Sequence, residues 1–91
     1  MKNKTKFIDA QKMAVKYPES FYALSLATLD TIKKGSIVKV AVEGERFWVK
    51  VTSVKGNKIT GKVDNFLVFV DLEVGEKIEF EKRHVYDISE Y

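Results

Sequence analysis

The chain has 91 residues, of which 16 are basic and 13 acidic, so its formal net charge is +3. Hydrophobic residues make up 45% and charged residues 32%, a balance that indicates a folded domain and excludes a disordered segment. The absence of cysteine excludes disulfides and thiolate metal sites and indicates a reducing compartment. No apolar run approaches the roughly 20 residues of a membrane helix. We therefore expect one cytoplasmic domain over residues 1–91 that does not enter a membrane.

The first predicted element is a helix over about residues 5–17. Its apolar residues recur at the spacing of one helical face. They are Phe7, Ala10, Met13, Ala14 and Tyr17. Thr5 can cap the first turn, and Pro18 ends the helix because the residue before a proline avoids the α conformation.

The connecting segment, residues 18–35, carries more apolar side chains than a free loop would. A short helix is predicted from Thr28 to Lys34, with Thr28 as its cap and Gly35 at its end. The part before this helix, from Phe21 to Leu26, is expected to be extended and to pack across a sheet.

An antiparallel β-meander is predicted over residues 36–91, because the apolar period changes from 3.6 to 2 at Ser36. Glu43-Gly44 and Lys55-Gly56-Asn57 are expected to form its first two turns. The predicted strands cover residues 38–42, 46–52, 59–64, 66–70 and 77–81, and residues 84–88 add a helical turn or an edge segment. The fold class is α+β, with the N-terminal helix packed on a strongly curved meander of about five strands, and a small open barrel is the alternative.

The register of the meander divides it into two faces. Pairing across the two turns places four pairs on one apolar face, which is the predicted core. These pairs are Val38 with Val49, Val40 with Phe47, Val49 with Val63, and Val51 with Gly61. The opposite face is a basic strip with one tryptophan at its centre. Its residues are Lys39, Arg46, Trp48, Lys50, Thr52, Thr60, Lys62 and Asp64.

Trp48 supports two interpretations. A flat aromatic ring among cations suits stacking on a base, with the cations on phosphates. In the other interpretation the ring is structural and lies beneath Tyr22, Leu24 and Leu26 of the connecting segment. The candidate binding residues are Lys39, Arg46, Trp48, Lys50 and Lys62.

The chain shows no motif of a known catalytic chemistry. His84 is the single histidine and is expected to be an incidental surface residue. The glycines are spaced as turn and strand glycines, unlike a phosphate-binding loop, and a zinc site would need three or four ligands. Asn65 is expected to cap the turn that follows its strand. We therefore predict no catalytic residue, no metal ion, no cofactor and no enzyme activity.

Three stretches carry a resemblance to a known family. They are Gly44–Val51, Ile59–Asn65 and Val74–Ile78, and the aromatic–acid pair Tyr86-Asp87 follows them. In these stretches the chain resembles the YegJ-like domain of unknown function, an uncharacterised bacterial and phage family. The resemblance covers roughly residues 9–88 and implies the same helix-plus-sheet fold. It implies no catalytic motif and no particular ligand.

These patterns favour a small non-catalytic binding module, of a phage-type or accessory protein, that acts on a protein partner. The alternative is a binder of an anionic ligand, either nucleic acid or a nucleotide, through the basic face around Trp48. An exposed edge strand, such as residues 66–70, could also pair with a second copy of the chain.

Overall fold

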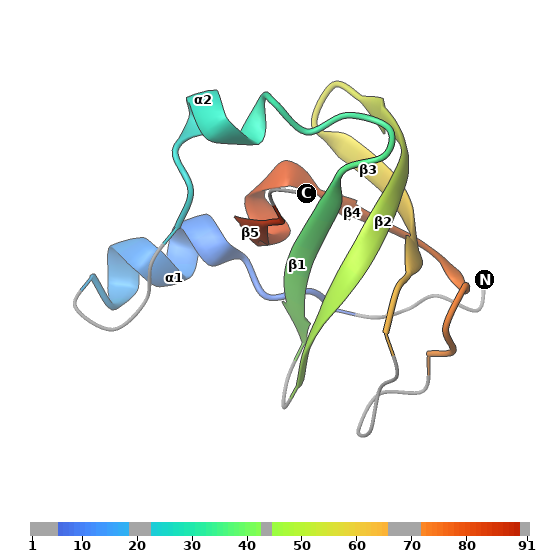
Figure 1. Cartoon of the computed structure of the whole chain (residues 1–91). Helices are drawn as coiled ribbons and strands as arrows, with labels where there is room; N and C mark the ends of the chain where they lie inside the picture. The colour runs from blue at the N-terminus through green and yellow to red at the C-terminus, as the bar shows by residue number, and fades with distance from the viewer. Residues whose placement is uncertain (1–5, 19–22, 43–44, 66–71, 90–91) are drawn as a thin grey trace.

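The computed structural model describes residues 6–18, 23–42, 45–65 and 72–89. These residues form a five-stranded antiparallel sheet, two short α-helices and a 3₁₀ turn (Figure 1). In chain order the elements are α1 (Ala10–Lys16), α2 (Leu26–Leu29), β1 (Ile37–Val42), β2 (Glu45–Lys55), β3 (Lys58–Val63), β4 (Lys77–Glu81), η1 (Lys82–His84) and β5 (Val85–Ile88). The predicted α+β class, with an antiparallel sheet of about five strands, is confirmed.

The strand order is β4-β3-β2-β1-β5, and the sheet does not close into a barrel. β1 to β4 form a meander, and β5 pairs with the other side of β1. The 3₁₀ turn η1 carries the chain from β4 at one edge to β5 at the other. Of the two alternatives predicted for residues 84–88, the edge segment is present as β5, and the helical turn lies before it, at Lys82–His84. The predicted strand 66–70 and the predicted turn Glu43-Gly44 lie outside the described residues.

Strand pairing follows the predicted register. The four predicted pairs are present: Val38 with Val49, Val40 with Phe47, Val49 with Val63, and Val51 with Gly61. The residues Gly56-Asn57 join β2 to β3, and Gly56 takes the positive φ, +59°, that such a tight turn requires. Between Val51 and Ser53 the register of β2 against β3 shifts, as in a β-bulge.

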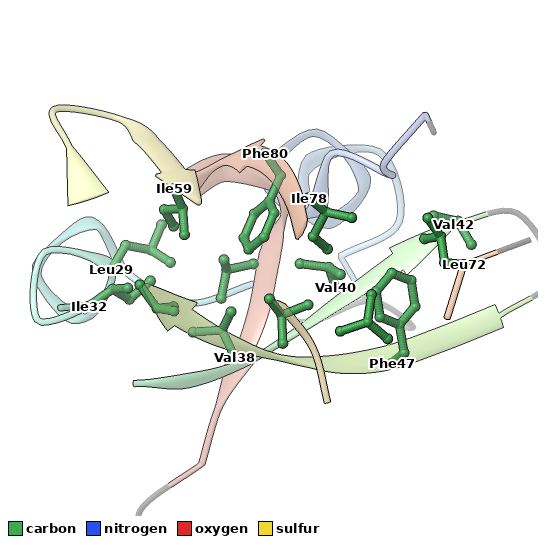
Figure 2. Packing of buried hydrophobic residues seen from close by; sticks show 14 residues of the cluster. Leu29, Ile32, Val38, Val40, Val42, Phe47, Ile59, Leu72, Ile78 and Phe80 are labelled. Carbon is green, nitrogen blue, oxygen red and sulfur yellow. The ribbon is translucent and has the colours of Figure 1, made fainter. Parts of the chain in front are cut away.

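The inner face of the sheet forms the core (Figure 2). Its strand residues are Val38, Val40, Val42, Phe47, Val49, Val51, Ile59, Val63, Ile78, Phe80 and Val85. Leu29 and Ile32 of the connecting segment lie at one end of this cluster. The Phe7 ring centroid lies 6.3 Å from that of Phe47 on β2 and 5.5 Å from that of Phe80 on β4. Since one ring contacts both strands, the sheet curves strongly around its core.

The first helix begins at Ala10, five residues after the predicted start at about residue 5. Asp9 is its N-cap, and the Asp9 side chain accepts a hydrogen bond of 3.0 Å from the Lys12 N–H. The predicted cap, Thr5, lies outside the described residues. The helix ends at Lys16, close to the end that Pro18 predicts.

Tertiary burial explains the late start of α1. Phe7, predicted on the helical stripe, instead forms an isolated β-bridge with Val42 and buries its ring against the core. Burying an aromatic side chain stabilises a fold by about 1.5–3 kcal/mol, which exceeds the difference in helix propensity at one position. The helix itself contacts η1 and β5 at the edge of the sheet, and Ala10 is its buried residue.

The second helix also differs from its prediction over residues 28–34. Ser25 is the cap of α2 and accepts a hydrogen bond of 3.2 Å from the Thr28 N–H, so Thr28 lies inside the helix. The chain then turns to bury both Leu29 and Ile32 in the core, which a longer exposed helix would not allow. The helix ends at Leu29 and not at Gly35 as predicted, and Gly35, with φ +95°, lies in the turn that leads into β1.

Gly61 leads to a prediction about stability. A Cβ atom on Gly61 would lie 2.5 Å from Val49 Cγ1 and 2.8 Å from the Lys50 carbonyl oxygen, which belongs to the paired backbone of β2. Gly61→Ala is therefore expected to lower the free energy of unfolding by about 1–3 kcal/mol, the usual cost of overpacking. Urea unfolding followed by Trp48 fluorescence measures this change.

The control for Gly61→Ala is Ser53→Ala, at an exposed position on β2. It should change the free energy of unfolding by no more than about 0.5 kcal/mol. An unchanged urea midpoint for Gly61→Ala would show that β2 and β3 are not packed as closely as described.

Candidate functional site

Three lysines lie in one row across the outer face of the sheet, the face opposite the core. Lys50 on β2 is the Cα partner of Lys62 on β3, and Lys62 is the Cα partner of Lys77 on β4. All three are exposed. Directly opposed side chains in a sheet have Cβ atoms about 4.5–5.5 Å apart, and like charges in such pairs are destabilising. We call Lys50, Lys62 and Lys77 the lysine row.

Two charges of the lysine row are not neutralised by a described neighbour. The ion pairs found among the described residues lie elsewhere: Lys82–Asp30, Arg83–Asp9 and Arg83–Glu81. Within that part of the chain neither Lys50 nor Lys62 forms an ion pair. The outer face therefore presents concentrated positive charge at its centre, where an anion would relieve the repulsion between the two lysines.

Trp48 lies next to the lysine row, two residues from Lys50 on β2, and is half-buried. Its Cα partner on β1 is Lys39, and the Lys39 Nζ lies 5.2 Å from the centroid of the Trp48 ring. A cation at this distance is attracted to the face of the ring. One face of the predicted stacking platform is therefore occupied by Lys39.

The predicted cover over Trp48 is not made by the described part of the connecting segment. Leu24 packs against the core cluster on the inner face, and Leu26 is 74% exposed. Tyr22 lies outside the described residues. The structural interpretation of Trp48 is thus wrong for Leu24 and Leu26, because Leu24 packs on the other face of the sheet and Leu26 is exposed.

Asn65 fixes the backbone on which Trp48 is carried. Its Oδ1 accepts a hydrogen bond of 2.6 Å from the Trp48 N–H, and the Asp64 N–H donates to the Trp48 carbonyl oxygen over 2.9 Å. The next turn, which Asn65 was predicted to cap, lies outside the described residues. Through its Oδ1 the side chain continues the pairing of β2 beyond Val63, where β3 ends.

Arg46 lies farther along β2, and its guanidinium carbon is 5.4 Å from the ring centroid of Tyr86 on β5. Burial raises the pKa of Tyr86, and Asp87 raises it further, while Arg46 opposes both. Arg46 thus has an aromatic partner of its own, away from the lysine row. The five predicted residues all lie on the outer face, but they fall into three groups: Lys50 with Lys62, Lys39 with Trp48, and Arg46 with Tyr86.

His84 is not the incidental surface residue that was predicted. It is half-buried, and its Nδ1 accepts a hydrogen bond of 3.0 Å from the Glu81 N–H at the start of η1. Burial lowers the pKa of His84 below its ordinary 6.5, and Arg83 lowers it further, while Glu81 and Asp9 oppose the shift. The imidazole also lines a cavity of about 490 Å³ together with Lys6, Phe7, Lys58, Glu79, Phe80 and Glu81.

Arg83 connects the start of the first helix to the turn that holds His84. Its guanidinium contacts Asp9 Oδ2 at 2.9 Å and Glu81 Oε1 at 3.1 Å. Burial raises the pKa of Asp9, but the hydrogen bond from Lys12 and the Arg83 guanidinium together outweigh this and lower it. The group is structural, since it joins the N-cap of α1 to the end of β4 and to η1.

Two residues of this face were not predicted as site residues. Lys77 joins the lysine row only through the pairing of β4 with β3, and Tyr86 joins Arg46 only through the pairing of β5 with β1. The period-2 pattern of β4 and β5 indicates which of their side chains share a face. It does not predict their register against β3 and β1, because the connections are long.

No family model, curated protein or solved structure matches the chain. The resemblance to the YegJ-like family therefore stays a prediction. Among the described residues, no three His, Cys, Asp or Glu side chains gather as metal ligands would. In the same part of the chain, no helix is long and apolar enough to cross a membrane.

Removing the Asn65 side-chain acceptor tests how much its hydrogen bond with the Trp48 N–H contributes to stability. Asn65→Ala leaves the Trp48 N–H without this partner, and we expect the free energy of unfolding to fall by about 1–3 kcal/mol. Asn65→Asp keeps an acceptor oxygen and should retain most of the stability. Urea unfolding and the Trp48 emission maximum are the measurements. An equal decrease in the free energy of unfolding for both variants would show that this hydrogen bond does not account for the stabilising effect of Asn65.

The lowered pKa of His84 predicts how the free energy of unfolding depends on pH. Its pKa is lowered in the folded state, so the unfolded chain binds more protons once the pH falls below about 6.5. The free energy of unfolding should therefore decrease from about pH 7 to about pH 5. His84→Gln offers a side-chain acceptor that does not titrate, and should flatten this decrease. Asp9, whose pKa is lowered from 3.8, would contribute only at more acidic pH. An equally steep decrease in His84→Gln would exclude His84 as the cause.

Proposed function

We propose that this domain is a non-catalytic binding module that holds single-stranded nucleic acid on the outer face of its sheet. The observation that supports the proposal most is the lysine row, which opposes like charges directly across three strands. Ammonium groups on long stems are suited to phosphates as compact point charges. Non-specific nucleic acid binding depends mainly on such contacts, which release counterions from the phosphates.

The charge of the whole chain is consistent with such a partner. The formal net charge is +3 and the sequence pI about 9.1. A positive field of this kind attracts polyanions at moderate salt without making binding irreversible. We therefore expect weak, salt-sensitive binding with little preference for sequence.

Trp48 supports a single strand as the ligand, once its contact with Lys39 is taken into account. An exposed cation–π contact is worth about 0.5–1 kcal/mol. Stacking of a base on an aromatic side chain is worth about 1–3 kcal/mol. A base can thus displace the Lys39 ammonium from the ring, and the released cation is then next to the phosphate of the same nucleotide.

A protein partner, the function favoured by the sequence pattern, is the second candidate. The observation in its favour is the Lys39–Trp48 contact itself, because a ring already covered by a cation needs no base. An acidic protein surface would meet the same lysines through its carboxylates. The two candidates differ in what happens at Trp48, since only a nucleic acid brings a base to stack there.

Salt dependence tests the proposed function. Binding of a single-stranded oligothymidylate is expected to quench Trp48 fluorescence and to weaken between about 50 mM and about 200 mM salt. Contacts of Lys50, Lys62 and the released Lys39 with three phosphates predict a slope of log K against log salt of about −2, at about −0.7 for each contact. Lys62→Gln should make the slope shallower by about 0.7. Titration of the oligonucleotide into the protein at several salt concentrations gives both values.

The matched control is Lys12→Gln, which removes one charge from exposed α1, away from the outer face. Its slope should equal that of the unmodified chain. Polyglutamate serves as the second ligand: binding of polyglutamate together with failure of the oligonucleotide to bind would favour the acidic protein. If neither ligand binds at low salt, the outer face is not an anion-binding surface.

A further inference from the structure

The cavity that His84 lines has the size of a small-molecule site. Its volume is about 490 Å³, and such sites usually measure about 300–1,000 Å³. Its lining residues come from the segment before α1, from β3 and β4, and from η1. No residue of the lysine row lines it. The cavity is therefore a different site from the outer-face surface proposed for nucleic acid.

The strand β4, which forms one wall of the cavity, has an open edge. Among the described strands it pairs with β3 alone. In an antiparallel pair, residues that exchange backbone hydrogen bonds alternate with residues that do not. The Lys82 N–H donates to the Asn57 carbonyl oxygen over 2.9 Å, which places Glu79 and Glu81 among those that do not. The backbone N–H and C=O groups of Glu79 and Glu81 therefore point away from β3.

His84 indicates that this edge faces the cavity. Its Nδ1 accepts the outward N–H of Glu81 at 3.0 Å, and the imidazole lines the cavity. The next outward groups along the edge are the N–H and C=O of Glu79, which is another lining residue. An N–H at such an edge can donate to a carboxylate, and a C=O can accept from an ammonium group.

Three aromatic rings lie together in the wall of the cavity. The centroid of the Phe7 ring is 5.5 Å from that of Phe80 and 5.8 Å from that of His84. Centroids about 4.5–7 Å apart are typical of favourable aromatic pairs. A ligand that carries an aromatic ring would extend this cluster and remove its own apolar surface from water.

The wall also carries charges of both signs. Lys58 and Glu79 are exposed, and within the described residues neither forms an ion pair. Exposed Lys6 adds a second cation. Glu81 differs from Glu79, because its Oε1 lies 3.1 Å from Arg83 Nε. Two cations and one carboxylate of the wall thus need partners from a ligand.

The positions of Lys58 and Glu79 suit a ligand with two opposite charges close together. Lys58 is the Cα partner of Glu81, so Glu79 is its diagonal neighbour, and such neighbours are about 7–8 Å apart. In an α-amino acid a single carbon separates the ammonium group from the carboxylate. One such ligand can therefore contact both side chains, and its ammonium group also meets the outward C=O of Glu79.

We propose that this cavity binds a free aromatic α-amino acid. The ligand carboxylate contacts Lys58 and the N–H of Glu79, and the ammonium group contacts the carboxylate and C=O of Glu79. The ring packs against Phe7, Phe80 and His84. An aromatic acid without the ammonium group would bring its carboxylate next to that of Glu79, and like charges repel. A residue of a longer peptide lacks at least one of the two charges.

Four related ligands test the proposal. L-Phenylalanine has the ring and both charges, whereas 3-phenylpropionate lacks the ammonium group, L-phenylalaninamide lacks the carboxylate and L-alanine lacks the ring. NMR titrations that follow the backbone amide signals of the labelled chain give each dissociation constant. L-Phenylalanine should bind about threefold or more tightly than either singly charged ligand, the size of an exposed ion pair. It should bind about tenfold or more tightly than L-alanine, because only its ring is buried.

Two substitutions assign the charges. Glu79→Gln should reduce the preference for L-phenylalanine over 3-phenylpropionate, and Lys58→Gln should reduce its preference over L-phenylalaninamide. Both positions are exposed, so the variants should remain folded. The matched controls are Glu73→Gln and Lys12→Gln, at exposed positions outside the cavity lining. The controls should keep the dissociation constants of the unmodified chain.

Each contrary outcome overturns the proposal in a different way. Equal binding of 3-phenylpropionate and L-phenylalanine would indicate a site for aromatic acids. Equal binding of L-phenylalaninamide would indicate a site for the N-terminal residue of a peptide. Unchanged preferences in both Glu79→Gln and Lys58→Gln would place the ligand elsewhere, and the absence of amide shifts at millimolar L-phenylalanine would exclude the site. None of these outcomes bears on nucleic acid binding, since the lysine row lies outside the cavity lining.

Discussion

The register of β2 against its two neighbours is the constraint on which the rest of the structure depends. Phe47, Val49 and Val51 are almost fully buried, and each contributes to the core that the five strands enclose. A slip of one residue would exchange all three with Trp48 and Lys50 and place a charge in the core. The same alternation that secures the fold therefore sets out the charged outer face, so the candidate site is a direct consequence of core packing.

The sequence could predict this register because the turns are short. Between β2 and β3 only Gly56 and Asn57 intervene, which leaves few alternative pairings for two alternating segments. The place of Lys77 could not be predicted in the same way. Thirteen residues separate Val63 from Lys77, and a connection of that length fixes no register by itself.

Local signals failed where long-range contacts outweighed them. Phe7 fits a helical stripe by its spacing, yet it gains more from contact with Phe47 and Phe80 than from the helix. Asn65 accepts a hydrogen bond from the Trp48 N–H, 17 residues away. His84 accepts one from the Glu81 N–H, three residues away. Such polar side chains have many possible partners in a sequence, and only the folded chain determines which backbone group each one meets.

The contact of Arg83 with Asp9 joins residues 74 positions apart, and Phe7 meets Phe80 in the same region. Closing so long a loop is entropically costly, so β1, β2 and β3, which pair through short connections, can form earlier during folding. On a translating ribosome, the first strands can pair before Phe80 and Arg83, the partners of Phe7 and Asp9, have been synthesised. The core of this small domain is therefore completed last at the place where its beginning meets its end.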